Sequence, residues 1–167
     1  MLLDEFEPIN IEFKTTSIGR IKFAADVMTA DCGTLEPIEF ELDTASDFTT
    51  LSRADLETLG YTAKQLADCP VHSVQARTGG GKFTLQYITN VSIKLAGREL
   101  QQTRVFFAKE EEYQKLLGTL FGVDLLKYFN FAVNYDKGLL TLQKVETLPQ
   151  LSTGESRVNI YSVENES

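Results

Sequence analysis

The chain has 167 residues, the length of one ordinary domain and too few for two typical hydrophobic cores. Hydrophobic residues make up 43% and charged residues 24%, which is the composition of a globular rather than a disordered protein. The net charge of −8 repels a phosphate backbone and no Lys/Arg cluster offsets it, so we expect no nucleic-acid partner. No stretch approaches the roughly 18 unbroken apolar residues of a membrane helix, so we expect no membrane partner.

The negative charge is concentrated at the two ends of the chain. Residues 1–12 carry a net charge of −4 and residues 146–167 a net charge of −3, which leaves −1 for residues 13–145. The last segment is also rich in Ser, Glu and Asn, a composition typical of loosely held tails. We therefore predict an acidic N-terminal extension over residues 1–12, a folded domain over residues 13–145 and a polar acidic tail over residues 146–167.

The cysteines and the first residues bear on the cellular compartment. Cys32 and Cys69 lack the spacing of metal ligands and are too few for a disulfide framework, so we expect free thiols and no metal. The first eight residues, MLLDEFEP, lack the basic and apolar regions of a secretory signal. We expect a cytoplasmic protein.

Alternation of apolar and polar residues predicts most of the secondary structure. It predicts strands over residues 9–13 and 38–42, and one long strand or a bent pair over residues 83–95. The apolar run at residues 105–107 predicts a further strand. Residues 129–135 and 139–143 flank the sequence Asp136-Lys137-Gly138, which is the signal of a β-hairpin.

Helical signals are few and short. Ser52 and Gly60 bracket a pattern of about two helical turns, and shorter patterns follow at residues 62–69, 110–117 and 123–129. The sequence contains no internal repeat. We therefore predict one mostly-β domain with brief helices.

Two segments that could carry chemistry have simpler structural interpretations. His72 is the single histidine and stands at the start of a strand pattern, so we interpret it as structural. The run Gly79-Gly80-Gly81-Lys82 lacks the glycine spacing of a phosphate-binding loop and lies between two strand patterns. We predict that it forms a hairpin tip.

The most informative segment surrounds Asp43. An alternating strand ends at Asp43-Thr44, and the small residues Ala45 and Ser46 follow before Asp47. One carboxylate alone makes a poor hydrolase, whereas two that share a proton can activate water and protonate a leaving amine. The second carboxylate must come from elsewhere in the chain or from another chain.

Four segments together resemble one protein family. The sequence Asp43-Thr44-Ala45-Ser46-Asp47 resembles the Asp-Thr-Gly-Ala-Asp/Ser signature of aspartic proteases of the single-domain, retropepsin-like kind. Residues Leu120–Leu126 resemble the second motif of that family, Phe129–Gln143 its closing strand pair and Val74–Leu95 its flap hairpin. The resemblance implies that residues 13–145 form a retropepsin-like domain, a closed or bent β barrel with a flap hairpin and short helices.

The resemblance also implies roles for individual residues. Asp43 would be the catalytic carboxylate, in a loop completed by Thr44, Ala45 and Ser46, with Thr44 hydrogen-bonding across a dimer axis. Substrate-binding roles would fall to Asp47, Gly79, Gly80 and Gly81, and the segment beneath the catalytic loop would be Leu120, Phe121 and Gly122. Asp124 is expected to cap the helix that follows.

The single motif predicts the assembly. Pepsin-like proteases carry two such motifs at about twice this length, so a working pair of carboxylates here requires a homodimer with the site on its two-fold axis. The expected activity is that of an aspartic endopeptidase that needs no cofactor and cleaves a polypeptide bound in extended form.

Ala45 keeps two alternatives open, because the family has Gly at this position and its backbone lies against the bound peptide. The first is a catalytically inactive retropepsin-like module for peptide binding or dimerisation. The second is a latent form in which residues 1–10 or 148–167 occupy the cleft until they are removed.

Overall fold

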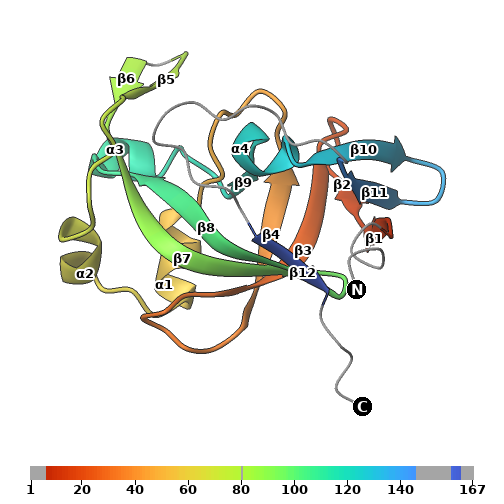
Figure 1. The fold of residues 1–167 in the computed structure, drawn as a ribbon. Helices are drawn as coiled ribbons and strands as arrows, with labels where there is room; N and C mark the ends of the chain where they lie inside the picture. The colour runs from red at the N-terminus through yellow and green to blue at the C-terminus, as the bar shows by residue number, and fades with distance from the viewer. Residues whose placement is uncertain (1–6, 80, 146–158, 163–167) are drawn as a thin grey trace.

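The computed structural model describes residues 7–79, 81–145 and 159–162, and these residues are mostly β (Figure 1). The strands are β1 (Ile9–Glu12), β2 (Lys14–Thr15), β3 (Ile21–Met28), β4 (Glu36–Leu42), β5 (Ala76–Thr78), β6 (Gly81–Phe83), β7 (Leu85–Leu95), β8 (Arg98–Ala108), β9 (Leu120–Phe121), β10 (Phe129–Asn134), β11 (Leu139–Lys144) and β12 (Asn159–Ser162). The helices are α1 (Arg53–Thr58), α2 (Ala63–Ala67), α3 (Glu111–Gln114) and α4 (Val123–Leu126). The predicted fold class, mostly β with short helices, is confirmed.

The described strands form three sheets. The largest has seven strands, in the order β12-β8-β7-β3-β4-β9 with β2 paired to β3. Thr50 forms isolated bridges with Leu120 of β9 and Phe106 of β8, so this sheet bends round on itself. A second sheet has the order β1-β11-β10, and β5 and β6 form a separate hairpin. Among the named strand pairs, only β4 and β9 run parallel. This parallel pair brings the residues that follow β4 beside the residues that follow β9.

Three phenylalanines anchor the parallel pair in the core. Phe23 of β3, Phe40 of β4 and Phe121 of β9 are all at most 2% exposed. Their ring centroids lie 5.5 to 6.1 Å apart, within the range of favourable aromatic pairs. Burial of each ring contributes about 1.5–3 kcal/mol of hydrophobic stabilisation. Both segments that surround the candidate site are therefore fixed to the same part of the core.

Most of the alternating segment predicted over residues 83–95 forms the single strand β7, which has a local irregularity, while Phe83 belongs to β6. β7 pairs with β8 along its length, and the pairing register shifts on either side of Val91. Asn90 has a φ of 56°, which accompanies this bulge. The two strands join through Ala96 and Gly97, both with positive φ, as a tight two-residue hairpin requires. The bulge explains why the sequence pattern suited either one strand or a bent pair.

Both segments that the sequence assigned to the chain ends contribute strands. β1 pairs with β11, and Ile9 and Ile11 are each 5% exposed, so residues 9–12 belong to the folded body. Their burial outweighs the acidic composition on which the boundary at residue 12 was based. β12 adds to the outer edge of β8. The rest of the two acidic ends, residues 1–6, 146–158 and 163–167, lies outside the described residues. None of the helices in the described ranges has the length and apolar character needed to cross a bilayer.

Candidate active site

Asp43 stands at the end of β4, where the chain turns sharply. Its Oδ1 accepts a hydrogen bond from the Ala45 N–H at 2.9 Å, and its carbonyl accepts one from the Ser46 N–H at 3.3 Å. Asp favours such turns because its side chain can bond to backbone two residues on. The Asp43 side chain is half-buried, whereas Thr44 and Ala45 are exposed. The local sequence thus ends the strand and presents a carboxylate beside an accessible loop.

Ala45 fits this turn without backbone strain. Among the described residues, positive φ at positions other than glycine occurs only at Asn90 and Ala96, so the conformation at Ala45 is one that alanine adopts freely. The family's glycine is therefore not needed for backbone conformation within one chain.

The segment after β9 interlocks with this turn. The Asp43 N–H donates to the Phe121 carbonyl at 3.1 Å, and the Val123 N–H donates to the Ser46 carbonyl at 2.8 Å. Gly122 lies between these two bonds. A Cβ atom built on Gly122 would lie 2.6 Å from the Phe48 carbonyl carbon and 2.8 Å from the Ser46 oxygen. The two loops therefore approach so closely that position 122 has no room for a side chain.

A buried threonine completes the contact between the loops. Thr49 is fully buried, and its Oγ1 accepts from the Gly122 N–H at 3.1 Å and donates to Asp124 Oδ1 at 2.6 Å. The same Asp124 oxygen accepts the Leu125 N–H at 3.0 Å. The N-cap residue of α4 is Gly122, so Asp124 is the second residue of the helix. The expectation that Asp124 caps the helix is therefore wrong, and no local pattern in the sequence indicated its bond to Thr49.

Burial raises the pKa of the Asp124 carboxyl above its usual range, although the hydrogen bonds from Thr49 and Leu125 act in the opposite direction. A carboxyl group whose pKa is raised by folding stabilises the folded state most at pH values below the group's ordinary pKa. That contribution is lost as the pH rises through the folded-state pKa.

Asp124→Asn should therefore match or exceed the wild type in free energy of unfolding at pH 7, because Asn keeps the acceptor oxygen and removes the buried charge. The difference should shrink as the pH falls to 4, as measured by urea unfolding. Thr49→Val should instead lose about 1–3 kcal/mol, because it leaves the Gly122 N–H without its partner. Asp68→Asn, at an exposed acid after α2, is the control and should change the free energy of unfolding at pH 7 by no more than about 0.5 kcal/mol. A marked loss of stability in Asp124→Asn at pH 7 would contradict this account.

The remaining predicted site residues lie in two places. Asp47 is exposed directly after the Asp43 turn, and Leu120 and Phe121 form β9 beside β4. Gly79 and Gly81 lie at the turn between β5 and β6, and Gly81 has a φ of 130°. Gly80 lies outside the described residues. The β5–β6 hairpin projects from the body of the molecule (Figure 1).

His72 belongs to an aromatic cluster beside the candidate site. Its ring meets Phe48 and Phe106 edge-on, with centroid distances of 5.2 and 5.3 Å, and its backbone N–H donates to the Leu85 carbonyl at 2.8 Å. These contacts agree with the structural role that the sequence indicated. Within the described ranges, no three His, Cys, Asp or Glu side chains gather as metal ligands.

The sequence profile of a family described as aspartyl protease matches residues 26–121 of this chain, which is more than half of it. The chain belongs to the aspartyl protease family. The matched segment of this aspartyl protease begins in β3 and ends at Phe121, so it contains the Asp43 turn and the strand that supports it. The comparison with curated protein sequences gave no significant match.

A solved structure described as a retropepsin-like aspartic protease from Rickettsia conorii is similar to this aspartyl protease in fold. The TM-score is 0.53, the sequences are 22% identical, and the match covers 83% of this chain and 94% of that chain. The retropepsin-like fold that the sequence indicated is thereby confirmed.

Proposed function

We propose that this aspartyl protease is a catalytically competent endopeptidase in which two Asp43 carboxylates, one from each chain of a homodimer, form the active site. The observation that carries the proposal is the Asp43 turn itself. The Asp43 carboxylate is half-buried and accepts a hydrogen bond from the Ala45 N–H. The turn is held by the hydrogen bond from the Asp43 N–H to the Phe121 carbonyl and by close contact of Gly122 with the Ser46 carbonyl. The sequence contains a single motif of this kind, so a second chain must supply the second carboxylate.

The proposed chemistry needs only the two carboxylates and a water molecule. Two carboxyl groups in contact cannot both ionise easily, so one stays protonated while the other acts as a base. One carboxylate removes a proton from the water molecule, whose oxygen bonds to the peptide carbonyl carbon while the protonated partner hydrogen-bonds to the carbonyl oxygen. The C–N bond of the tetrahedral intermediate then breaks, and the amine leaves with a proton from the carboxyl pair. Because the pair must retain one proton, activity should be greatest on the acidic side of neutral pH.

The substrate in this proposal is a polypeptide in extended form. Such a chain hydrogen-bonds as an additional strand. Asp47 would lie at the edge of the cleft near the substrate backbone, and the β5–β6 hairpin, with Gly79, Gly80 and Gly81 at its tip, would cover it. Thr44 is exposed and would hydrogen-bond to its counterpart across the dimer axis.

The edge strand β10 supports a place for the second copy. β10 pairs only with β11 among the described strands, and its sequence, FNFAVN, carries no charge. Edge strands of monomeric proteins usually carry charges or prolines that prevent pairing with another chain. β10 also follows α4 closely, and the N-cap residue of α4, Gly122, lies against the catalytic loop. A partner that pairs with β10 would therefore be joined rigidly to the Asp43 turn.

One face of the three-stranded sheet is apolar, and this face is partly exposed to solvent at the edge strand β10. One cross-strand row runs from Ile9 through Leu142 to Phe131, whose side chains are 5%, 0% and 42% exposed. The first two belong to the core, whereas Phe131 is partly open to solvent.

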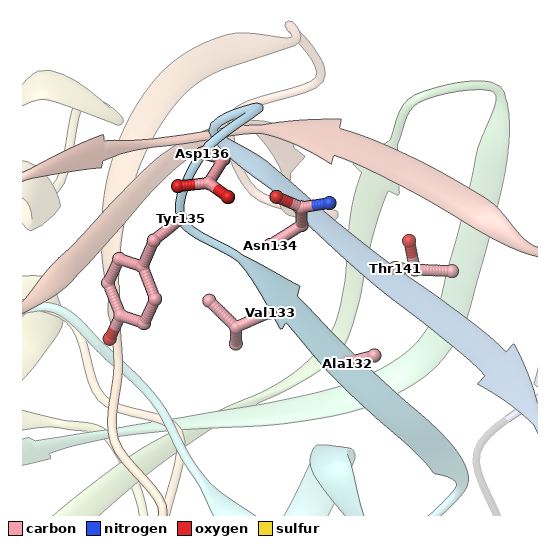
Figure 2. Close-up of a pocket in the computed structure, with 6 residues that line it drawn as sticks. All are labelled: Ala132, Val133, Asn134, Tyr135, Asp136 and Thr141. Atoms are coloured by element: carbon pink, nitrogen blue, oxygen red, sulfur yellow. The ribbon is translucent and has the colours of Figure 1, made fainter.

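An open hollow of about 570 Å³ lies beside the same hairpin. Figure 2 shows the residues that line it, which are Ala132, Val133, Asn134, Tyr135, Asp136 and Thr141. Tyr135 is 61% exposed. A second copy of the same chain could cover the uncharged edge, the exposed rings of Phe131 and Tyr135, and the neighbouring hollow.

Phe131→Glu should weaken the dimer, because two like charges would meet across a two-fold axis. We expect the dissociation constant of the dimer to rise at least about tenfold, which corresponds to about 1.4 kcal/mol. Sedimentation velocity over a range of protein concentrations measures this. Leu35→Glu is a matched control, since Leu35 is 48% exposed and precedes β4, at the end of that strand away from Asp43. A Phe131→Glu protein that dimerises as tightly as the control would place the interface elsewhere.

The function itself is tested by incubating the chain with a peptide library from pH 3 to 8 and identifying products by mass spectrometry. The expected result is cleavage that follows the dimer fraction measured on the same samples. Dimeric protein that cleaves nothing would instead favour the peptide-binding module. A mass shift of the chain that precedes the onset of cleavage would favour the latent form.

A further inference from the structure

The β5–β6 hairpin is fastened to the rest of its own chain at Thr84, the residue between β6 and β7. The Thr84 N–H donates to both carboxylate oxygens of Glu110, at 2.9 and 3.1 Å. The Thr84 carbonyl accepts the Lys109 N–H at 2.9 Å. Both backbone groups at the base of the hairpin are therefore held by residues 109 and 110, which precede α3.

The carboxylate of Glu110 is used for this contact and not for the helix. Glu110 is the N-cap residue of α3, but its side chain makes no capping hydrogen bond. Burial opposes ionisation of Glu110, but hydrogen bonds with Thr84 outweigh it and hold the pKa of Glu110 below its usual range. An ionised carboxylate accepts hydrogen bonds about twice as strong as those between neutral groups.

A second contact lies nearer the tip of the hairpin. The rings of Phe83 and Tyr113 are stacked, with centroids 4.9 Å apart and an interplanar angle of 17°, and Phe83 is 3% exposed. A Cβ atom built on Gly81 would lie 3.1 Å from the Tyr113 hydroxyl oxygen, so this hydroxyl rests against the backbone of β6. Tyr113 of α3 thus packs along the returning strand of the hairpin.

The cluster that holds the hairpin also contacts Phe48, which lies two residues after the catalytic loop. Phe83, Leu85, Phe106 and Ala108 form a small core separate from the main one, and Phe48 and Tyr113 pack against it. Phe48 is five residues after Asp43, and its carbonyl faces Gly122. A cavity of about 150 Å³ remains between the hairpin and the segment at residues 113–117. The contacts of Glu110 and Tyr113 therefore lie beside a gap in the packing of the hairpin.

We propose that Glu110 and Tyr113 are positioning residues that clasp the β5–β6 hairpin to its own chain and keep it ready to close on an extended polypeptide. The inference rests on the proposed function, in which this hairpin covers the substrate. A hairpin released from the clasp would occupy its binding-competent position for a smaller fraction of time. The apparent affinity for substrate falls in proportion to that fraction, while the chemical step at Asp43 is unaffected once substrate is bound.

The test compares Glu110→Ala and Tyr113→Ala with Glu111→Ala, an exposed neighbour on the same helix. Trypsin reports on the hairpin without any need for activity, because Arg77 in β5 and Lys82 in β6 are both exposed. We expect cleavage after these two residues to quicken at least about fivefold in the two clasp variants and to stay unchanged in the control. Glu110→Gln, which keeps one acceptor oxygen, should fall between Glu110→Ala and the wild type. Melting temperatures measured on all variants exclude global unfolding as the cause.

Peptide hydrolysis supplies the second measurement. We expect KM to rise about fivefold in Glu110→Ala and Tyr113→Ala, with kcat within about twofold of the wild type, and Tyr113→Phe to restore KM by restoring the stacked ring. An active wild type whose clasp variants show unchanged trypsin cleavage or unchanged KM would overturn this inference and leave the proposed function standing. A dimeric wild type that cleaves no peptide would overturn the proposed function itself, and the positioning role with it.

Discussion

Asp43→Asn should abolish peptide cleavage without unfolding the protein. Asn keeps an Oδ1 atom that can accept the Ala45 N–H, so the turn after β4 is preserved. It cannot act as a base toward water, and a pair with one Asn lacks the shared proton on which the proposed mechanism depends. Removal of a residue that takes part directly in catalysis lowers kcat by about 10⁴-fold or more. Rates are measured on the best peptide from the library, and melting temperatures on the same samples.

Two further measurements sharpen this prediction. Asp68→Asn, an exposed acid after α2, controls for the loss of one negative charge and should retain full activity. Mixed dimers then test whether the site is shared between chains. If Asp43→Asn chains are exchanged with an equal amount of wild type, random pairing leaves half of the wild-type chains in inactive dimers. Activity per wild-type chain should fall to about half, whereas a site contained within one chain would lose nothing.

The elements around Asp43 could be predicted because their signals are local. The alternation over residues 38–42 buries Ile38 and Phe40 and ends at an Asp, so a strand followed by a turn is expected from adjacent residues alone. Ser52 caps α1 by accepting the Asp55 N–H, as its place before the helical pattern indicated. The Asp-Lys-Gly signal likewise joins β10 to β11.

The connections that brace the site could not be predicted in this way. Thr49 bonds to Gly122 and Asp124 across separations of 73 and 75 residues. These two hydrogen bonds depend on the parallel pairing of β4 with β9, which no local sequence pattern predicts. One signal was available in the sequence, since a threonine next to apolar residues must find a hydrogen-bond partner if it is buried. The sequence did not say which partner that is.

Local sequence patterns also failed to predict the N-terminal boundary of the domain and the attachment of the β5–β6 hairpin. Ile9 and Ile11 showed a strand pattern, but the acidic residues around them favoured an extension, and only the pairing with β11 decides between the two. Glu110 belongs to a run of three acidic residues that the sequence presents as equivalent. Its neighbour Glu111 is exposed, whereas Glu110 bonds to Thr84 across 26 residues. Long-range geometry alone distinguishes the two.

Gly122→Ala should have the largest effect on stability. Gly122 has a φ of −98°, a conformation open to any residue, so the expected cost is entirely steric. The added methyl group would overlap the Phe48 and Ser46 carbonyl groups, and backbone atoms cannot rotate away as a side chain can. Overpacking of this kind costs about 1–3 kcal/mol and occasionally more, and the backbone obstacles place this substitution at or above about 3 kcal/mol.

Gly118→Ala is the matched control for this substitution. It lies four residues earlier in the same segment, and the nearest atom to a Cβ there is Leu120 Cδ2 at 3.9 Å, an ordinary contact. The control should change the free energy of urea unfolding by no more than about 0.5 kcal/mol. Both proteins are compared at one concentration, because the stability of a dimer depends on it. A loss of less than about 1 kcal/mol in Gly122→Ala would mean that the two loops can separate without cost. The Asp43 turn would then not be braced as the structure indicates. If the bracing holds, Gly122→Ala protein that remains folded at low temperature should still lose activity, since the overlap falls on the loop that carries Asp43.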